Sequence, residues 1–82
     1  MIHSKNIKSI FDLFPKGVPM TVETIQASVA RAFPLTNADW KPYTKTRATN
    51  YPKWKHRVQS VLSEYKKNKI VGHDPETNSY SF

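Results

Sequence analysis

The chain of 82 residues contains no cysteine and only two glycines. Without cysteine there are no disulfide bonds or thiolate metal sites, so packing alone must stabilise a domain of this size. The scarcity of glycine argues against a glycine-rich phosphate-binding loop. The apolar runs are only a few residues long, so neither a signal peptide nor a membrane-spanning helix is expected. We therefore expect a reducing, cytoplasmic setting and no membrane partner.

Residues with catalytic or metal-binding chemistry are also sparse. The six Asp+Glu are scattered, and the three histidines, His3, His56 and His73, are far apart in the sequence and form no HExxH or His-x-His motif. Such a set supports neither a metal site nor a paired-carboxylate site. We expect no cofactor, no metal, no small-molecule substrate and no enzymatic activity in this chain itself.

Positive charge is what the sequence has in excess. Thirteen Lys+Arg against six Asp+Glu give a formal net charge of +7. Residues 41–69 carry nine of the basic residues and a single acid, Glu64, whereas residues 70–82 carry two acids and no basic residue. A segment that combines cations with four aromatic residues favours nucleic acid as the partner, the alternative being a solvated, solubilising face.

The hydrophobic periodicity predicts three helices, a short strand and a C-terminal hairpin. The helices are expected over residues 4–14, 21–33 and 52–68, with a short edge strand at 18–20. A long loop over 35–50 is expected to hold one short helical turn near residues 36–40. Strand-like segments at 70–73 and 79–82 flank a five-residue turn. This order predicts an α+β winged helix-turn-helix over a single domain, 1–82, whose third helix is presented to the DNA major groove.

The third-helix segment YPKWKHRVQSVLSEYKKNKIV resembles a known family. Its Trp54, the Arg57-Val58 pair, the Val61-Leu62 pair and the lysines before Ile70 are similar to the N-terminal winged-helix domain of Mrr-type, modification-dependent restriction endonucleases. The resemblance implies a prokaryotic, nucleoid-associated module that reads DNA, including a modified base such as 5-methylcytosine, and is linked covalently to a nuclease domain. It also implies that the chain is excised from a longer protein, the alternative being a free-standing small protein.

The polar side of the third helix supplies the candidate base contacts, because the first half of a recognition helix reaches base edges. These candidates are Lys53, His56, Gln59 and Ser60. Cations, hydroxyls and amides around the preceding loop are typical of phosphate contacts. These are Lys41, Lys45, Arg47, Thr49, Asn50 and Lys55.

Two aromatic residues and one arginine leave alternatives open. Trp40 and Tyr43 are candidates for contact with a base or its methyl group, or for anchoring the loop. Trp54, with Tyr51, is expected in the core. Arg57 is expected to bind either a phosphate or a carboxylate such as Asp12 or Asp39. Two other functions compete with duplex binding: docking on an acidic protein, which the acidic turn after residue 73 favours, and binding of single-stranded RNA.

Overall fold

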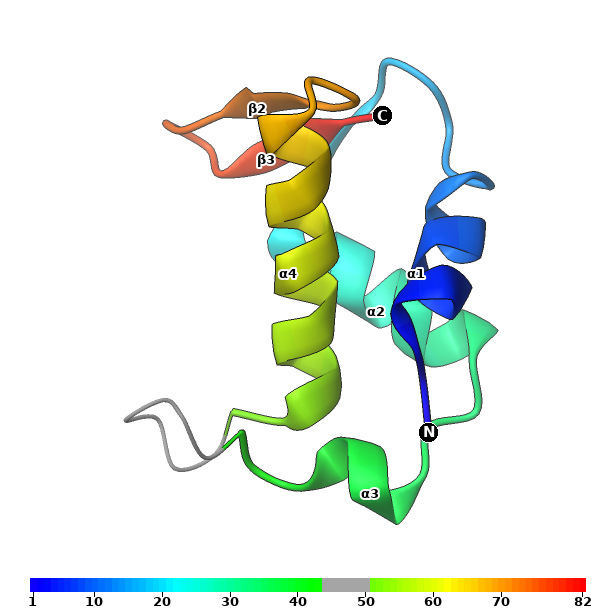
Figure 1. Ribbon diagram of the computed structural model, residues 1–82. Helices are drawn as coiled ribbons and strands as arrows, with labels where there is room; N and C mark the ends of the chain where they lie inside the picture. Colours follow the sequence, from blue (N-terminus) through cyan, green and yellow to red (C-terminus); the bar gives the residue numbers. More distant parts are fainter. Residues whose placement is uncertain (44–50) are drawn as a thin grey trace.

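The computed structural model describes residues 1–43 and 51–82, which form four helices and a small sheet at one end of the longest helix (Figure 1). The helices are α1 (Ser4–Phe11), α2 (Val22–Ala32), α3 (Asn37–Trp40) and α4 (Lys53–Lys67). The strands are β1 (Pro19–Thr21), β2 (Gly72–Asp74) and β3 (Ser79–Ser81). The predicted α+β class is confirmed.

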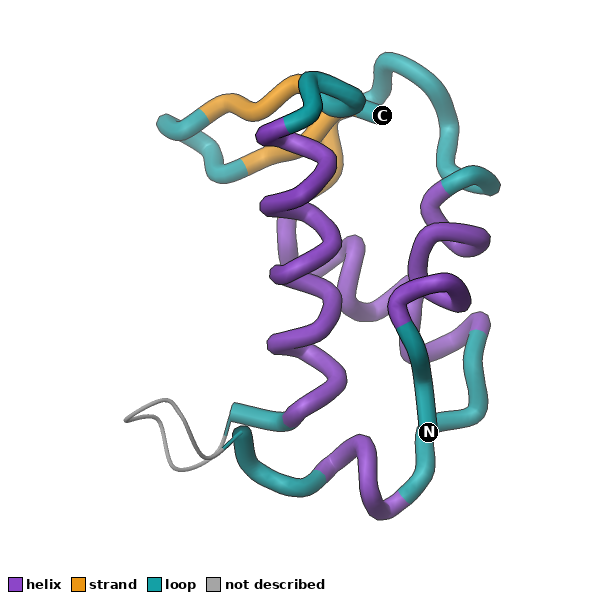
Figure 2. Tube along the Cα trace, in the orientation of Figure 1, coloured by secondary structure: helices purple, strands orange, loops and turns teal. Residues whose placement is uncertain are grey.

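The three strands form one antiparallel sheet in the order β1-β3-β2. Met20 of β1 and His73 of β2 both pair with Tyr80 of the central strand β3, one on each side. The predicted edge position of the first strand is therefore confirmed. The strands gather at one end of α4, while α3 lies beyond its other end (Figures 1 and 2). The sheet thus closes the core at the end of α4 opposite to its basic N-terminal half.

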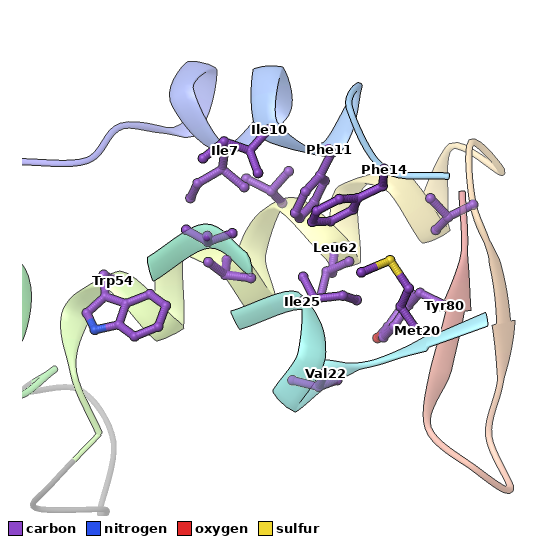
Figure 3. Close-up of a cluster of buried hydrophobic side chains, with 14 of the residues drawn as sticks. Ile7, Ile10, Phe11, Phe14, Met20, Val22, Ile25, Trp54, Leu62 and Tyr80 are labelled. Carbon is purple, nitrogen blue, oxygen red and sulfur yellow. The ribbon is translucent and has the colours of Figure 1, made fainter. Parts of the chain in front are cut away.

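The core joins α1, α2, α4 and the sheet in a single cluster (Figure 3). In α4 the apolar spacing fulfils the prediction for this helix, because Trp54, Val58, Val61 and Leu62 are all buried. A second group of aromatic rings, Phe11, Phe14, Tyr65 and Phe82, packs edge-on or tilted with centroid separations of 4.9–5.6 Å. Because its apolar side chains are buried in this core, α4 has a fixed position, and the side chains on its solvent-facing side project from a rigid helix.

The ends of α4 and α2 are defined by local chemistry. Thr21 caps α2, as predicted, by accepting a hydrogen bond from the Thr24 amide at 3.2 Å. At the end of α4, the amides of Ile70 and Lys69 donate to the carbonyls of Tyr65 and Lys66, which is the Schellman arrangement. Lys69 has a φ of 58°, in the left-handed region that favours glycine. The helix therefore stops despite the absence of the usual glycine.

Two predicted boundaries are wrong. The first helix ends at Phe11 rather than at residue 14, because the amides of Leu13 and Phe14 bond to carbonyls three residues back and tighten the chain into turns. Phe14 still reaches the core. The hairpin strand predicted at 70–73 begins at Gly72, since the Schellman turn occupies Ile70 and leaves its side chain 58% exposed.

Candidate nucleic-acid interface

The N-terminal half of α4 is joined to the segment after α3 by short antiparallel contacts. The Tyr43 amide donates to the Tyr51 carbonyl at 2.8 Å, and the Lys53 amide donates to the Lys41 carbonyl at 2.9 Å. Residues Pro42 and Pro52 pair between them. These contacts hold Lys41, which is predicted to contact a DNA phosphate, beside the start of α4. The predicted phosphate ligands Lys45, Arg47, Thr49 and Asn50 lie outside the described residues.

Tyr43 and His56 form a stacked pair at the start of α4. Their rings are 3.6 Å apart between centroids and only 12° from parallel. Ser60, one turn further along the helix, donates to the His56 carbonyl at 3.1 Å and lies 3.4 Å from His56 Nε2. The structure therefore brings together one predicted aromatic contact, Tyr43, and two predicted base contacts.

These three residues line a hollow that we call the α1-side hollow. Its volume is about 250 Å³ and its walls come from α4, the start of α1 and the segment before residue 44. The residues that line it are Ser4, Tyr43, Lys53, His56, Arg57 and Ser60. Among these described lining residues there are two permanent cations, three hydroxyls and no carboxylate. Such a surface attracts an anion with several oxygen atoms.

The opposite side of α4 carries a second hollow, the α2-side hollow, of about 290 Å³. It is lined by Glu23, Gln26, Ala27, Ala30, Trp40, Trp54 and Lys55. Here Trp40 packs edge-on against Trp54 with centroids 5.5 Å apart, and Lys55 Nζ lies 5.7 Å from the centre of the Trp54 ring. Trp40 is 53% exposed, whereas Trp54 is 2% exposed. The predicted pair Trp40 and Tyr43 is thus divided between two hollows.

The buried carboxylate of Asp39 fixes the segment that carries both aromatics. It accepts hydrogen bonds from the Ile2 amide at 3.0 Å, the Thr36 amide at 2.9 Å and the Thr36 hydroxyl at 3.1 Å. Burial alone would raise its pKa, but these hydrogen bonds and the nearby N-terminal amine outweigh burial and lower the pKa of Asp39. Asp39 is therefore held as a charged anchor between the N-terminus and α3.

The remaining candidates have distinct places. Gln59 is half-buried on α4 and lines neither hollow, and Trp54 is in the core as predicted, whereas Tyr51 is half-buried. Burial raises the pKa of the Tyr51 hydroxyl. Arg57 forms no ion pair with Asp12 or Asp39, and the ion pair found among the described residues joins Lys8 Nζ to Glu64 at 3.0 Å.

Ser4 and Arg57 of the α1-side hollow were not among the site residues predicted from the sequence. Ser4 had no expected functional role, and Arg57 was left between a phosphate and a structural carboxylate. Helical spacing places Arg57 one turn after Lys53, which indicates a shared side of α4. No local pattern brings Ser4 to the same place, because that contact depends on how α1 packs against α4.

The described residues hold no group of three or more His, Asp or Glu side chains placed to bind a metal ion. Within residues 1–43 and 51–82, no helix combines the length and the apolar character needed to cross a membrane. No protein-family model, curated protein or solved structure matches the chain.

Proposed function

We propose that this chain is a winged-helix module that binds double-stranded DNA as the target-recognition part of a modification-dependent restriction endonuclease. The order of helices and strands, with β3 central and a C-terminal hairpin, is typical of a winged helix and supports this assignment. The link to restriction enzymes and to a modified base rests on the resemblance of the α4 segment to the Mrr-type family.

The observation that supports this proposal most is the concentration of cations along α4 and beside its start, which have no carboxylate partner among the described residues. Lys41, Lys53, Arg57 and Lys55 lie around the N-terminal half, and Lys66 and Lys67 follow at the C-terminal end. Within the described residues the single carboxylate of α4, Glu64, is paired with Lys8. The turn between β2 and β3 is acidic at Asp74 and Glu76. Duplex phosphates are therefore attracted to α4 and repelled by the hairpin turn.

The solvent side of α4 has the shape and chemistry that duplex binding requires. The major groove is about 12 Å wide and admits one α-helix. The predicted base contacts Lys53, His56, Gln59 and Ser60 occupy the first two turns of α4. Lys donates to guanine O6 and N7, and Gln pairs with adenine. In this proposal Lys41 and Lys55, with Lys45, Arg47, Thr49 and Asn50, contact phosphates on either side.

Fluorescence anisotropy with labelled duplexes at two salt concentrations tests the proposal. We expect salt-sensitive binding with a log–log slope near −4 to −5, because about five phosphate contacts contribute roughly 0.9 each. Duplexes with 5-methylcytosine or N6-methyladenine are compared with unmodified DNA, and several-fold tighter binding to one modification supports the restriction assignment. Equal affinity for all duplexes leaves a general DNA-docking module. No duplex binding at low salt refutes the proposal.

Two substitutions separate base reading from phosphate binding. We expect Gln59→Ala to change the preference between sequences and Lys45→Ala to weaken all duplexes alike. Titration of a small panel of duplexes with each variant measures both effects. Equal effects of the two substitutions on every sequence would contradict these roles.

A second candidate function is docking of α4 on an acidic protein partner. The observation that favours it is the acidic turn at Asp74 and Glu76, where a DNA-binding wing would carry cations. Duplex binding that is absent at low salt, together with loss of partner binding on charge reversal of Lys53 and Lys55, would support this alternative. Competition by single-stranded RNA tests the RNA-binding alternative in the same assay.

A further inference from the structure

The α1-side hollow has the lining of an oxyanion site. Lys53 and Arg57 provide two positive charges one helical turn apart, and Ser4 and Ser60 provide hydroxyl groups from two different helices. Arg57 is half-buried on α4 and lines the hollow. Guanidinium groups bind phosphate oxygens through two parallel hydrogen bonds, and serine hydroxyls are common phosphate donors.

The two positive charges of the hollow are not neutralised by ion pairs within the described part of the protein. Among the described residues, neither Lys53 nor Arg57 has a carboxylate partner. Glu64 lines an adjoining hollow of about 290 Å³ together with Ser4 and Ser60. Its carboxylate is held by Lys8 Nζ at 3.0 Å. The α1-side hollow therefore keeps an uncompensated positive charge that an incoming anion can neutralise.

The hollow is also formed before any ligand arrives. His56 is stacked on Tyr43, whose backbone amide is bonded to the Tyr51 carbonyl, and Ser60 is bonded to the His56 carbonyl. A preorganised site loses less conformational entropy on binding than a flexible one. The volume of about 250 Å³ equals roughly eight waters at about 30 Å³ each, which is room for a phosphate and its ester carbons.

We propose that the α1-side hollow binds one phosphate group of the DNA backbone, with Arg57 and Lys53 on its oxygens and Ser4 as a hydroxyl donor. This assignment rests on the proposed duplex binding and deepens it. It gives Lys53, His56 and Ser60 a phosphate-positioning role in place of base contact. Base reading then falls to Gln59, which lies on α4 outside the hollow.

The test is an NMR titration of the ¹⁵N-labelled protein with sodium phosphate, thymidine 5′-monophosphate and the dinucleotide TpT. Chloride keeps the ionic strength constant. We expect saturable shifts confined to the amides of Ser4 and Ser60 and to Arg57 Nε. TpT distinguishes an internal backbone diester from the terminal monoester of the nucleotide. Shifts that spread over the surface lysines and do not saturate would show an adventitious ion only and would overturn the assignment.

Matched variants locate the effect. Arg57→Gln and Arg31→Gln each remove one guanidinium, the first at the hollow and the second on the exposed last turn of α2, away from it. We expect Arg57→Gln to weaken TpT binding at least fivefold and Arg31→Gln to change it less than twofold. Ser60→Asp, which places a carboxylate on the exposed rim of the hollow, is expected to abolish TpT binding and serves if Arg57→Gln does not fold. Equal weakening by the first two variants, or TpT binding retained by Ser60→Asp, would overturn the assignment.

Duplex titrations separate this inference from the proposed function. Binding of TpT in the hollow without binding of any duplex would leave the phosphate site standing and refute duplex recognition. Duplex binding that Arg57→Gln weakens no more than Arg31→Gln would refute the phosphate site and leave duplex recognition standing. With both correct, Arg57→Gln reduces the duplex salt slope by about 0.9, the contribution of one phosphate contact.

Discussion

The two sides of α4 carry hollows of similar volume and different chemistry. The α1-side hollow holds two cations, hydroxyls and no carboxylate among its described residues, whereas the α2-side hollow is lined by two tryptophans, two alanines, Gln26 and the opposite charges of Lys55 and Glu23. Lys53 and Lys55, two residues apart in one helix, belong to different hollows because successive helical residues turn by about 100°. Net charge alone therefore says little about where a ligand binds, and neighbouring lysines of one helix have separable functions.

Substitution of Trp54 should have the largest effect on stability, because this residue packs in the core and also lines the α2-side hollow. We expect Trp54→Ala to lower the free energy of unfolding by about 3–5 kcal/mol, as for other large-to-small core changes. Both hollows are then lost together. Urea unfolding followed by circular dichroism measures the change.

A conservative substitution provides the control for this prediction. The indole Nε1 of Trp54 is buried and has no hydrogen-bond partner among the described residues. In Figure 3 this nitrogen is turned away from the other labelled side chains of the cluster. Trp54→Phe retains a ring and removes the unpaired N–H, so it should destabilise the fold clearly less than Trp54→Ala. Equal losses from both variants would contradict the packing argument.

Substitution of Asp39 has the next largest expected effect. Asp39→Ala leaves the buried amide of Ile2 and the part-buried amide and hydroxyl of Thr36 without their acceptor, and we expect a loss of about 1–3 kcal/mol. Because α3 and Tyr43 follow this anchor, the stacking of Tyr43 on His56 should loosen. Urea unfolding measures the stability, and the chemical shifts of His56 report the stacking. Unchanged His56 shifts in a destabilised variant would refute the link to the α1-side hollow.

The lowered pKa of Asp39 also predicts a pH dependence. In the unfolded chain an aspartate has a pKa of about 3.9, so on acidification the unfolded state takes up the proton first. The stability that the Asp39 carboxylate contributes is thus present above that value and is lost as the pH falls through the lower pKa of the folded state. Urea midpoints between pH 7 and acid pH should fall more steeply for the native chain than for Asp39→Asn. Parallel curves would contradict the assignment.

Much of the fold follows from local sequence patterns. Val58, Val61 and Leu62 recur at helical spacing and are buried in α4, and Thr21 caps α2. The boundaries were harder to predict, because they depend on backbone hydrogen bonds that the pattern does not encode. Lys69 adopts the left-handed conformation of a helix end although a sequence interpretation would look for glycine there.

The candidate site was less predictable than the fold. Trp40 and Tyr43 look equivalent in the sequence, yet α3 ends between them and Lys41 is extended, with φ of −61° and ψ of 143°, so they enter different hollows. Ser4 joins Arg57 through the packing of α1 on α4, a tertiary contact that no local motif signals. Charge distribution identified α4 correctly as the cationic element, and only the three-dimensional arrangement divides its cations between two sides.

The smallest expected effect, and the sharpest comparison of the two sides, comes from removing one negative charge from each. Glu64 lines the hollow next to the α1-side hollow, and Glu23 lines the α2-side hollow. The Lys8–Glu64 pair is exposed, so Glu64→Gln should change the free energy of unfolding by less than about 1 kcal/mol. It should tighten TpT binding about twofold, because at an effective dielectric near that of water each nearby charge contributes only a fraction of a kcal/mol to about 1 kcal/mol. Glu23→Gln changes the net charge equally but lies across α4, and it should leave TpT binding unchanged. An equal gain from both variants, measured in the same NMR titration, would mean that net charge sets the affinity and that the two sides do not differ in phosphate binding.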